Sequence, residues 1–214
     1  MKLRIHDVIK GSRVNGPGNR YVIWFQGCSI HCPDCFNKDL WKFEGGKEYW
    51  VSEVVDDIRA SGCEGVTISG GEPFDQYIQL FGLVYLLSHP EIQEQLTKGI
   101  ICFSGYDFSE ISRKYLAESC INNIDLLIAG RYDESQKQDN ALAGSSNQEF
   151  IWNPAKGRGK DKISEDEVMF DQEVEVHPVE NFYQKDKQEN VYKVTGFPQI
   201  EEAALKEFGI EIIE

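Results

Sequence analysis

Four short apolar runs alternate with helix-like segments, and this alternation constrains the fold more than any other feature of the chain. The runs are rich in β-branched and aromatic residues, which is typical of strands buried on both faces of a sheet. They lie at residues 21–25, 65–69, 99–104 and 125–130. The segments that separate and follow them place apolar residues at helical spacing, at 51–61, 77–92 and 107–118. This order predicts an α/β fold with a parallel sheet and right-handed crossovers.

The alternation ends well before the chain does. A closed eight-stranded barrel takes about 250 residues, whereas the pattern in this 214-residue chain stops near residue 153. We therefore expect residues 1–152 to form an incomplete, laterally open (β/α) barrel whose strand-to-helix loops gather on one rim. Residues 153–214 are predicted to be an acidic C-terminal extension that packs on this core or completes it. Edge strands are expected at 173–178 and 191–197, and a short helix between Pro198 and Gly209.

The charge of the chain limits its partners. A net charge of −14 argues against nucleic-acid binding, which needs clustered Lys and Arg. Residues 1–20 are an exception, with five basic residues against one acidic residue, and they form either a solvated face or a docking surface for an acidic electron donor. No run of eighteen apolar residues and no secretory signal is present, so we expect a cytoplasmic protein that does not bind membranes.

Three of the six cysteines, Cys28, Cys32 and Cys35, follow the first apolar run within eight residues. Cytosolic thiols stay reduced, which favours metal ligands over disulfides. Structural zinc takes four ligands, but no second pair follows at the usual spacing, and His31 lies inside the loop that it would have to close. A ferredoxin-type cluster also needs four cysteines. The other cysteines fall in presumed strands and helices and are interpreted as small buried residues: Cys63, Cys102 and Cys120.

Three thiolates are enough to hold a [4Fe–4S] cluster in which one iron has no protein ligand. Such an iron is useful when a small molecule binds to it. The absence of a fourth cysteine nearby therefore favours a cluster that binds a substrate or a cofactor.

The C-x3-C-x2-C spacing of Cys28, Cys32 and Cys35 resembles that of the radical S-adenosylmethionine superfamily, whose open iron binds the amino and carboxylate groups of the cofactor. A second motif supports this resemblance independently. "SGGEP", residues 69–73, ends the next predicted strand, as the glycine-rich motif of the superfamily does. Glycines allow a ligand to approach the main chain closely. A side chain at Gly71 is then expected to obstruct the cofactor without touching the metal.

Further segments narrow the resemblance. "VNGPGNR" before the first strand, with Gly16, Pro17, Gly18 and Arg20, and Asn37 after the cysteines are similar to the glycyl-radical-enzyme activases. "FSGYDFSEI" and the stretch ending in "GSSNQ" resemble the branch that activates anaerobic ribonucleoside-triphosphate reductase. The resemblance covers about residues 3–152 and implies the open barrel of the radical S-adenosylmethionine type.

The resemblance also implies cofactors, contacts and partners. Cys28, Cys32 and Cys35 would bind the [4Fe–4S] cluster, and no other catalytic residue is predicted. The predicted S-adenosylmethionine contacts are Asp34, Phe36, Asn37, Gly70, Gly71 and Glu72, with the main chain at Asp34 and Phe36 near adenine and Gly71 near the methionyl amine. Reductive cleavage of S-adenosylmethionine would give a 5′-deoxyadenosyl radical that abstracts hydrogen from a glycine of a partner, most simply an anaerobic ribonucleotide reductase. Flavodoxin or ferredoxin would supply the electron.

Two other functions remain open at this stage. A radical enzyme of the same superfamily could modify a peptide or a small molecule, although peptide modifiers often carry cysteine-rich domains and residues 121–214 contain no cysteine. A non-catalytic iron–sulfur electron carrier or redox sensor would need a fourth ligand and would have no use for "SGGEP". Formation of 5′-deoxyadenosine separates the carrier from the enzymes.

Overall fold

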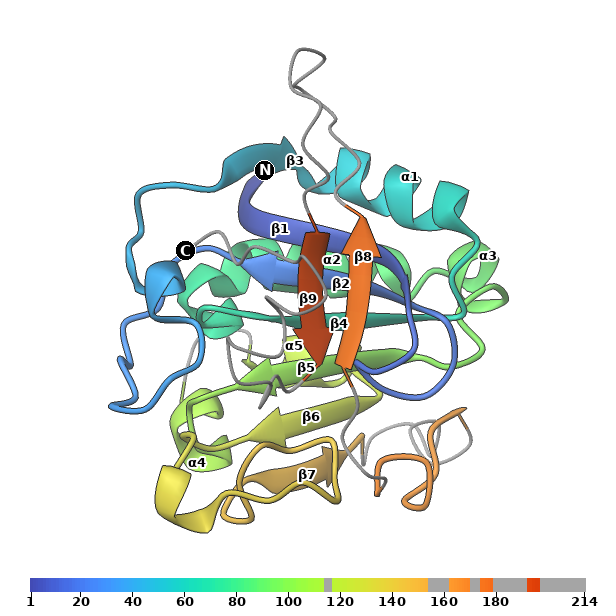
Figure 1. Cartoon of the computed structure of the whole chain (residues 1–214). Coiled ribbons are helices and arrows are strands. Elements are labelled where there is room, and N and C mark those ends of the chain that lie inside the picture. Colours follow the sequence, from blue (N-terminus) through green and yellow to red (C-terminus); the bar gives the residue numbers. More distant parts are fainter. Residues whose placement is uncertain (114–116, 154–161, 170–173, 179–191, 197–214) are drawn as a thin grey trace.

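The computed structural model describes residues 1–113, 117–153, 162–169, 174–178 and 192–196 (Figure 1). Its main feature is a seven-stranded sheet with the order β3-β1-β2-β4-β5-β6-β7. The strands of this sheet are β1 Lys2–Ser12, β2 Arg20–Phe25, β3 Lys47–Trp50, β4 Gly65–Gly70, β5 Ile100–Ser104, β6 Leu126–Ala129 and β7 Glu149–Trp152.

The four predicted apolar runs form the centre of the sheet. They are β2, β4, β5 and β6, which pair in parallel in that order. The predicted parallel sheet is extended at both edges by antiparallel strands, since β1 pairs antiparallel with β2 and β3, and β7 pairs antiparallel with β6. The edge strands were missed because they are partly exposed and carry many charged or polar residues, so no buried run marks them. The sheet is open and mixed.

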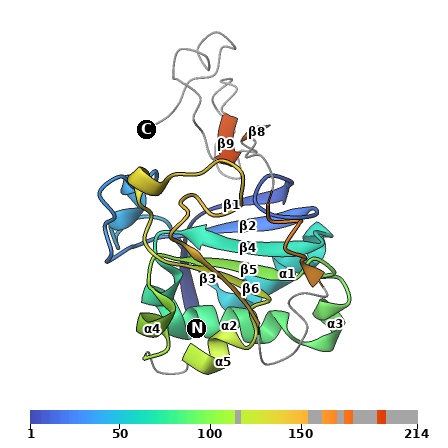
Figure 2. The same cartoon turned by 90° about the horizontal axis from the view of Figure 1, so that it is seen from below.

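Helices cover one face of the sheet (Figure 2). They are α1 Val51–Ser61, α2 Tyr77–Leu87, α3 Pro90–Gln93, α4 Phe108–Ile111 and α5 Ala117–Ile121. Three 3-10 turns lie in the loops that follow strands: η1 Lys38–Trp41, η2 Pro73–Gln76 and η3 Glu134–Gln136. The main apolar core lies between these helices and the sheet. On β5, Ile100 and Cys102 join this core, whereas Ile101 belongs to a second apolar cluster. Alternation along the strands therefore fills both faces, as the continuous apolar runs predicted.

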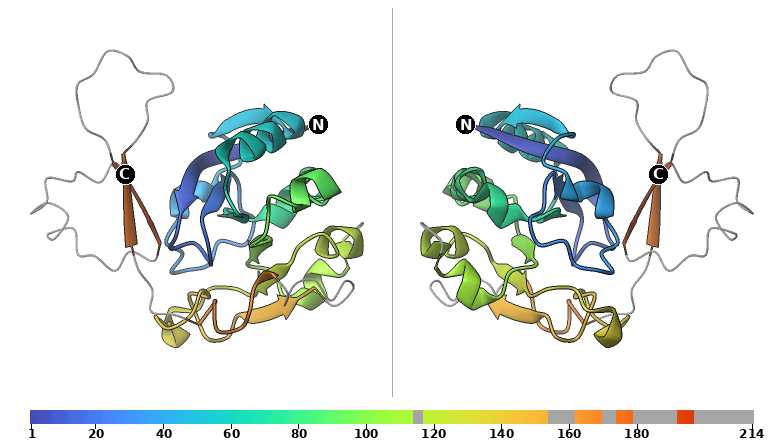
Figure 3. Two further views of the ribbon diagram at one scale, coloured as in Figure 1. Left: turned by 90° about the vertical axis from the view of Figure 1, so that its right-hand side faces the viewer. Right: turned by 90° about the vertical axis from the view of Figure 1, so that its left-hand side faces the viewer.

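The extension contributes to the second cluster. Ile163 and Val168 are buried there beside Ile101 and Leu126. The predicted edge strands exist, as β8 Val174–Pro178 and β9 Tyr192–Gly196, but they pair with each other in a separate two-stranded sheet. Figure 3 shows the main sheet as an open arc with the helices on one side and this hairpin on the other. The helix expected between Pro198 and Gly209 lies outside the described residues.

Glu175 of β8 connects the hairpin to the main sheet. Its carboxylate accepts a hydrogen bond from the Ser12 hydroxyl at 2.9 Å. The backbone N–H of Arg13 donates to both carboxylate oxygens, at 2.9 and 3.1 Å. Ser12 is fully buried at the end of β1. The hairpin is thus held against β1 by hydrogen bonds to a charged acceptor, which are stronger than neutral ones.

Arg20 connects the amino ends of the parallel strands β2, β4 and β5 by hydrogen bonds. Its guanidinium is fully buried and donates to Thr67 Oγ1 at 2.6 Å. It also donates to four carbonyl oxygens, those of Pro17, Val66, Lys98 and Gly99, at 2.6–3.0 Å. Burial lowers the pKa of Arg20 to about 9. The arginine of the "GPG-x-R" element therefore has a structural role at the end of the sheet opposite to the cysteines.

No helix in the described part of the chain is both long and apolar enough to cross a membrane.

Candidate functional site

The cysteine loop begins where β2 ends. Cys28 is three residues beyond Phe25, and the main chain that follows returns to it through η1. Gly27 N–H donates to the Leu40 carbonyl at 2.9 Å, and Cys28 N–H donates to the Trp41 carbonyl at 3.2 Å. These bonds close a loop in which Cys28 is buried and Cys32 and Cys35 are partly exposed. The loop lies at the carboxyl ends of the parallel strands, as predicted.

The other cysteines lie elsewhere. Cys63, Cys102 and Cys120 are buried in the core between the sheet and the helices. Their assignment as packing residues is confirmed. Burial raises the pKa of the Cys102 thiol well above its ordinary value and that of Cys120 to about 12, which keeps both as neutral thiols.

The thiols of the loop have nearby N–H donors. Burial raises the pKa of Cys28, while the backbone N–H groups of His31 and Ile30 act in the opposite direction. Burial also raises the pKa of Cys32, opposed by the backbone N–H of Tyr132 and the charge of Arg131. Asn37 N–H donates to Cys35 Sγ at 3.4 Å. Iron binds thiolates, and these donors would stabilise the sulfur charge once the protons are released.

The "SGGEP" segment packs directly against the start of the cysteine loop. Gly71 N–H donates to the Phe25 carbonyl and Glu72 N–H to the Gly27 carbonyl, both at 2.8 Å. A Cβ on Gly71 would overlap the carbonyl oxygen of Gly27 and come within 2.7 Å of its carbonyl carbon. Glycine is therefore required here by contact between two protein segments, which the sequence interpretation as a cofactor cradle did not anticipate.

Glu72 joins the ends of β4 and β5. Its carboxylate is fully buried and accepts Phe74 N–H at 2.8 Å, Ser104 Oγ at 2.9 Å and Gly105 N–H at 2.8 Å. Burial raises the pKa of Glu72 to about 7, against the effect of these donors. The side chain of this predicted cofactor contact is thus engaged by the protein itself, and it fixes "SGGEP" against "SGYDF".

Asp75, Ser29 and Tyr106 form a hydrogen-bonded cluster that the sequence did not predict. Asp75 accepts Ser29 N–H at 2.7 Å and the hydroxyl of Ser29 at 3.0 Å. The Tyr106 hydroxyl donates to Asp75 at 2.8 Å and lies 2.9 Å from the Ser29 hydroxyl. Burial raises the pKa of Tyr106 to about 12. The cluster connects the cysteine loop to the loops after β4 and β5, and all three residues lie within or beside quoted motifs.

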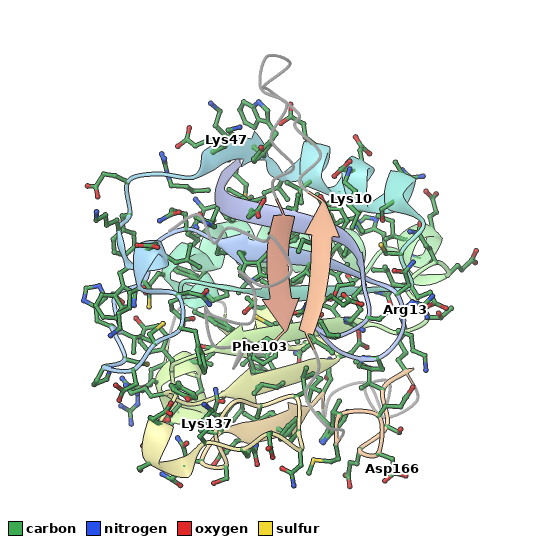
Figure 4. All side chains as sticks on the ribbon, viewed as in Figure 1. Lys10, Arg13, Lys47, Phe103, Lys137 and Asp166 are labelled. Carbon is green, nitrogen blue, oxygen red and sulfur yellow. The ribbon has the colours of Figure 1, made fainter. Side chains whose placement is uncertain are left out.

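The predicted adenine segment meets the loop after β6. Asp34, Phe36 and Asn37 are exposed, and the Phe36 ring lies 4.9 Å from the ring of Tyr132. The ammonium of Lys137 lies 6.0 Å from the Phe36 ring, and Figure 4 shows Lys137 near the lower edge of the sheet. The loops after β4, β5 and β6 therefore come together around the cysteine loop.

The "GSSNQ" segment holds the Tyr132 loop in place. Asn147 donates to the Arg131 carbonyl at 2.9 Å, and Gln148 donates to the Gly130 carbonyl at 3.0 Å. The Arg131 side chain pairs with Glu110 at 2.8 and 3.0 Å. Asn147 and Gln148 therefore stabilise the main chain of the loop that carries Tyr132.

Two observations test whether the loop suits a [4Fe–4S] cluster. Among the described residues, no three His, Cys, Asp or Glu side chains converge on a point that could hold a single metal ion. A cluster takes one thiolate for each iron, so its ligands need not converge on one point. In the same part of the chain the indole N–H of Trp41, whose ring stacks on His31, is buried without an acceptor. Three thiols that can bind iron and an indole N–H that can donate to sulfur are compatible with an iron–sulfur cluster.

Comparison with known proteins gives the same result. Residues 14–151 match the family described as a 4Fe-4S single cluster domain. Over 156 residues, 68% of this chain and 96% of the relative, the sequence is 31% identical to the anaerobic ribonucleoside-triphosphate reductase-activating protein of Salmonella typhi. The protein of that name from Enterobacteria phage T4 is 26% identical over 155 residues, 67% of this chain and 90% of the relative.

A further relative is the pyruvate formate-lyase-activating enzyme of Staphylococcus epidermidis, 43% identical over 84 residues, 36% of this chain and 33% of the relative. The chain belongs to the glycyl-radical activases of the radical S-adenosylmethionine superfamily. A [4Fe–4S] cluster and S-adenosylmethionine are the cofactors of such an activase. The match to the family model ends at residue 151, close to the predicted end of the core.

Proposed function

We propose that this activase reductively cleaves S-adenosylmethionine at a [4Fe–4S] cluster bound by Cys28, Cys32 and Cys35, and that it generates a glycyl radical on an anaerobic ribonucleotide reductase. The observation that carries the proposal is the placement of three cysteines at the rim where "SGGEP" and "SGYDF" also lie, while the other three described cysteines are buried in the core. The similarity to anaerobic reductase-activating proteins over nearly the whole relative favours this partner.

When bound, the cluster supplies one electron that splits the sulfonium S–C5′ bond into methionine and a 5′-deoxyadenosyl radical, which takes a hydrogen atom from glycine. The residues of the chain position the reactants. Gly70, Gly71 and Glu72 would offer main-chain groups to the methionyl end. Asp34, Phe36 and Asn37, which are exposed, would contact adenine, and the Phe36 ring lies beside that of Tyr132.

An open barrel of the radical S-adenosylmethionine type suits a macromolecular substrate. The sheet has two antiparallel edges and does not close (Figure 3). A loop of a separate enzyme could then reach the cluster through the open side. A small substrate would instead require a closed site that excludes water.

We also propose that residues 1–152 form the radical S-adenosylmethionine core and that residues 153–214 complete it. Two contacts support this division. Ile163 and Val168 are buried in the second apolar cluster, and Glu175 is hydrogen-bonded to Ser12 and Arg13. A chain truncated after residue 152 should therefore lose stability rather than behave as an intact domain, and a truncated chain with unchanged thermal stability would contradict the proposal.

A flavodoxin or ferredoxin electron donor and a cytoplasmic location complete the proposal. The basic segment at residues 1–20 is a poor candidate for the donor surface. Arg20 is buried, Lys2 and Arg4 pair with Glu48, and Lys10 pairs with Asp57. Figure 4 shows Lys10 and Arg13 on the right-hand side, away from the carboxyl ends of the parallel strands on the left in Figure 1. The donor must reach the cluster, so it should dock nearer the cysteine loop.

Electron paramagnetic resonance tests the proposed function. The reconstituted protein is reduced anaerobically and mixed with S-adenosylmethionine and the anaerobic ribonucleotide reductase of the same genome. We expect 5′-deoxyadenosine and a glycyl-type doublet located on the reductase, with neither product in a Cys32→Ala control. Cleavage without a radical on any glycyl-radical enzyme would indicate a peptide or small-molecule substrate, and a cluster without cleavage would indicate an electron carrier.

A further inference from the structure

Trp41 lies against the loop that carries the cysteines. Its carbonyl oxygen accepts Cys28 N–H at 3.2 Å, and its ring stacks on His31, with ring centroids 4.6 Å apart and planes inclined by 22°. His31 stands between Cys28 and Cys32 and has a φ of +55°, a left-handed conformation that side chains other than glycine seldom adopt. The indole is thus a packing surface for the short segment between two of the proposed ligands.

The indole nitrogen has an unusual environment. Trp41 Nε1 is buried, and no acceptor for its hydrogen is present in the part of the chain that the structure describes. An indole N–H can only donate a hydrogen bond. Buried donors nearly always have a partner, and tryptophan is placed in interiors where its N–H can reach one. An acceptor next to the cysteine loop would satisfy this group.

We propose that Trp41 Nε1–H donates a hydrogen bond to a sulfur atom of the cluster, either a bridging sulfide or a cysteine thiolate, and thereby raises the reduction potential of the cluster. The inference rests on the proposed cluster site and adds a positioning and tuning residue to it. Reduction adds one negative charge to the cluster. Hydrogen bonds to its sulfur atoms strengthen as that charge grows, so they favour the reduced form.

A Trp41→Phe variant tests the proposal because it keeps an aromatic ring for His31 but lacks the N–H. Trp50→Phe is the matched control, since Trp50 is exposed on β3. Cluster content is measured as iron and sulfide, and the reduction potential by a titration monitored by electron paramagnetic resonance, without S-adenosylmethionine. We expect the ratio of reduced to oxidised cluster at fixed potential to fall about tenfold in Trp41→Phe, which corresponds to about 59 mV for a one-electron couple.

The Trp50→Phe protein should match the wild type. An unchanged potential in a Trp41→Phe protein that carries a full cluster overturns the proposal.

A measurement on the wild type keeps the proposal testable if the variant does not fold. The chain is labelled with nitrogen-15 at its four tryptophans, and pulsed electron paramagnetic resonance of the reduced cluster detects coupling to an indole nitrogen. We expect such a coupling in the wild type and in Trp50→Phe, and its loss in Trp41→Phe. If the wild-type protein binds the cluster but shows no coupling to an indole nitrogen, the proposed role of Trp41 is refuted and the proposed cluster site is not. A wild type that binds no cluster refutes the cluster site and this proposal together.

Discussion

Replacing Gly71 by alanine should weaken the rim of the sheet and impair cluster binding together. The new Cβ would overlap the Gly27 carbonyl oxygen and lie 2.7 Å from its carbonyl carbon, whereas carbon atoms in contact are about 3.5–4.0 Å apart. The main chain at Gly27 must therefore move by about 1 Å. That movement strains two buried hydrogen bonds, Gly71 to Phe25 and Glu72 to Gly27. The next residue is Cys28, so the displacement reaches the first proposed ligand.

The magnitude follows from these contacts. Overpacking costs about 1–3 kcal/mol, and a buried backbone group that loses its partner costs about 1–3 kcal/mol. The free energy of unfolding should then fall by about 4 kcal/mol, which lowers Tm by about 10 °C or more in a chain of this size. The glycine motif by itself predicted a different outcome, with an intact cluster and a defect only in cofactor cleavage.

Gly62→Ala is the matched control. Gly62 follows α1 with a φ of +68°, and a Cβ there would have no atom within 4 Å. Alanine in this conformation costs about 1–2 kcal/mol without any clash. Thermal unfolding of the apo proteins under anaerobic conditions and the iron content after reconstitution compare the two variants. The reasoning is refuted if Gly71→Ala unfolds at the same temperature as Gly62→Ala and binds as much iron.

Alanine at Cys28, Cys32 or Cys35 should abolish the cluster absorbance after reconstitution, whereas alanine at any of the three buried cysteines should retain it; retention in Cys32→Ala would contradict the ligand assignment. Arg20→Met should lower the free energy of unfolding by about 3 kcal/mol or more, because it removes the guanidinium donor from four carbonyl oxygens and from Thr67. Its folded fraction should still bind the cluster, and loss of iron from folded protein would argue against a purely structural role.

The stability of the apo protein should also depend on pH through Glu72, whose pKa is raised from 4.5 to about 7. Between these values the folded state holds a proton that the unfolded chain has released, so stability falls as the pH rises, by about 3 kcal/mol in total. Glu72→Gln should flatten this dependence in urea denaturation at several pH values, and an unchanged slope would disprove the assignment.

The sequence alone determined which strands form the parallel centre of the sheet and which loop carries the three closely spaced cysteines. A buried strand needs a continuous run of apolar residues, and β2, β4, β5 and β6 each show one. The spacing of Cys28, Cys32 and Cys35 is local, so it is visible before folding. The burial of Cys102 in β5 and of Cys120 in α5 follows equally from their apolar neighbours, and Cys63 is buried between α1 and β4.

Only the tertiary structure decided which rim residues meet. Glu72 and Ser104 are 32 positions apart, and Ser29 and Asp75 are 46 apart. Whether such residues touch depends on the register of neighbouring strands and on the direction in which each loop leaves the sheet. Neither the register nor the loop direction can be predicted from a local sequence pattern. The same holds for Gly71, whose motif was visible but whose nearest neighbour, the Gly27 carbonyl, is set by the packing of two loops. Spacing along the chain therefore indicated the candidate groups, and long-range packing determined how they are held.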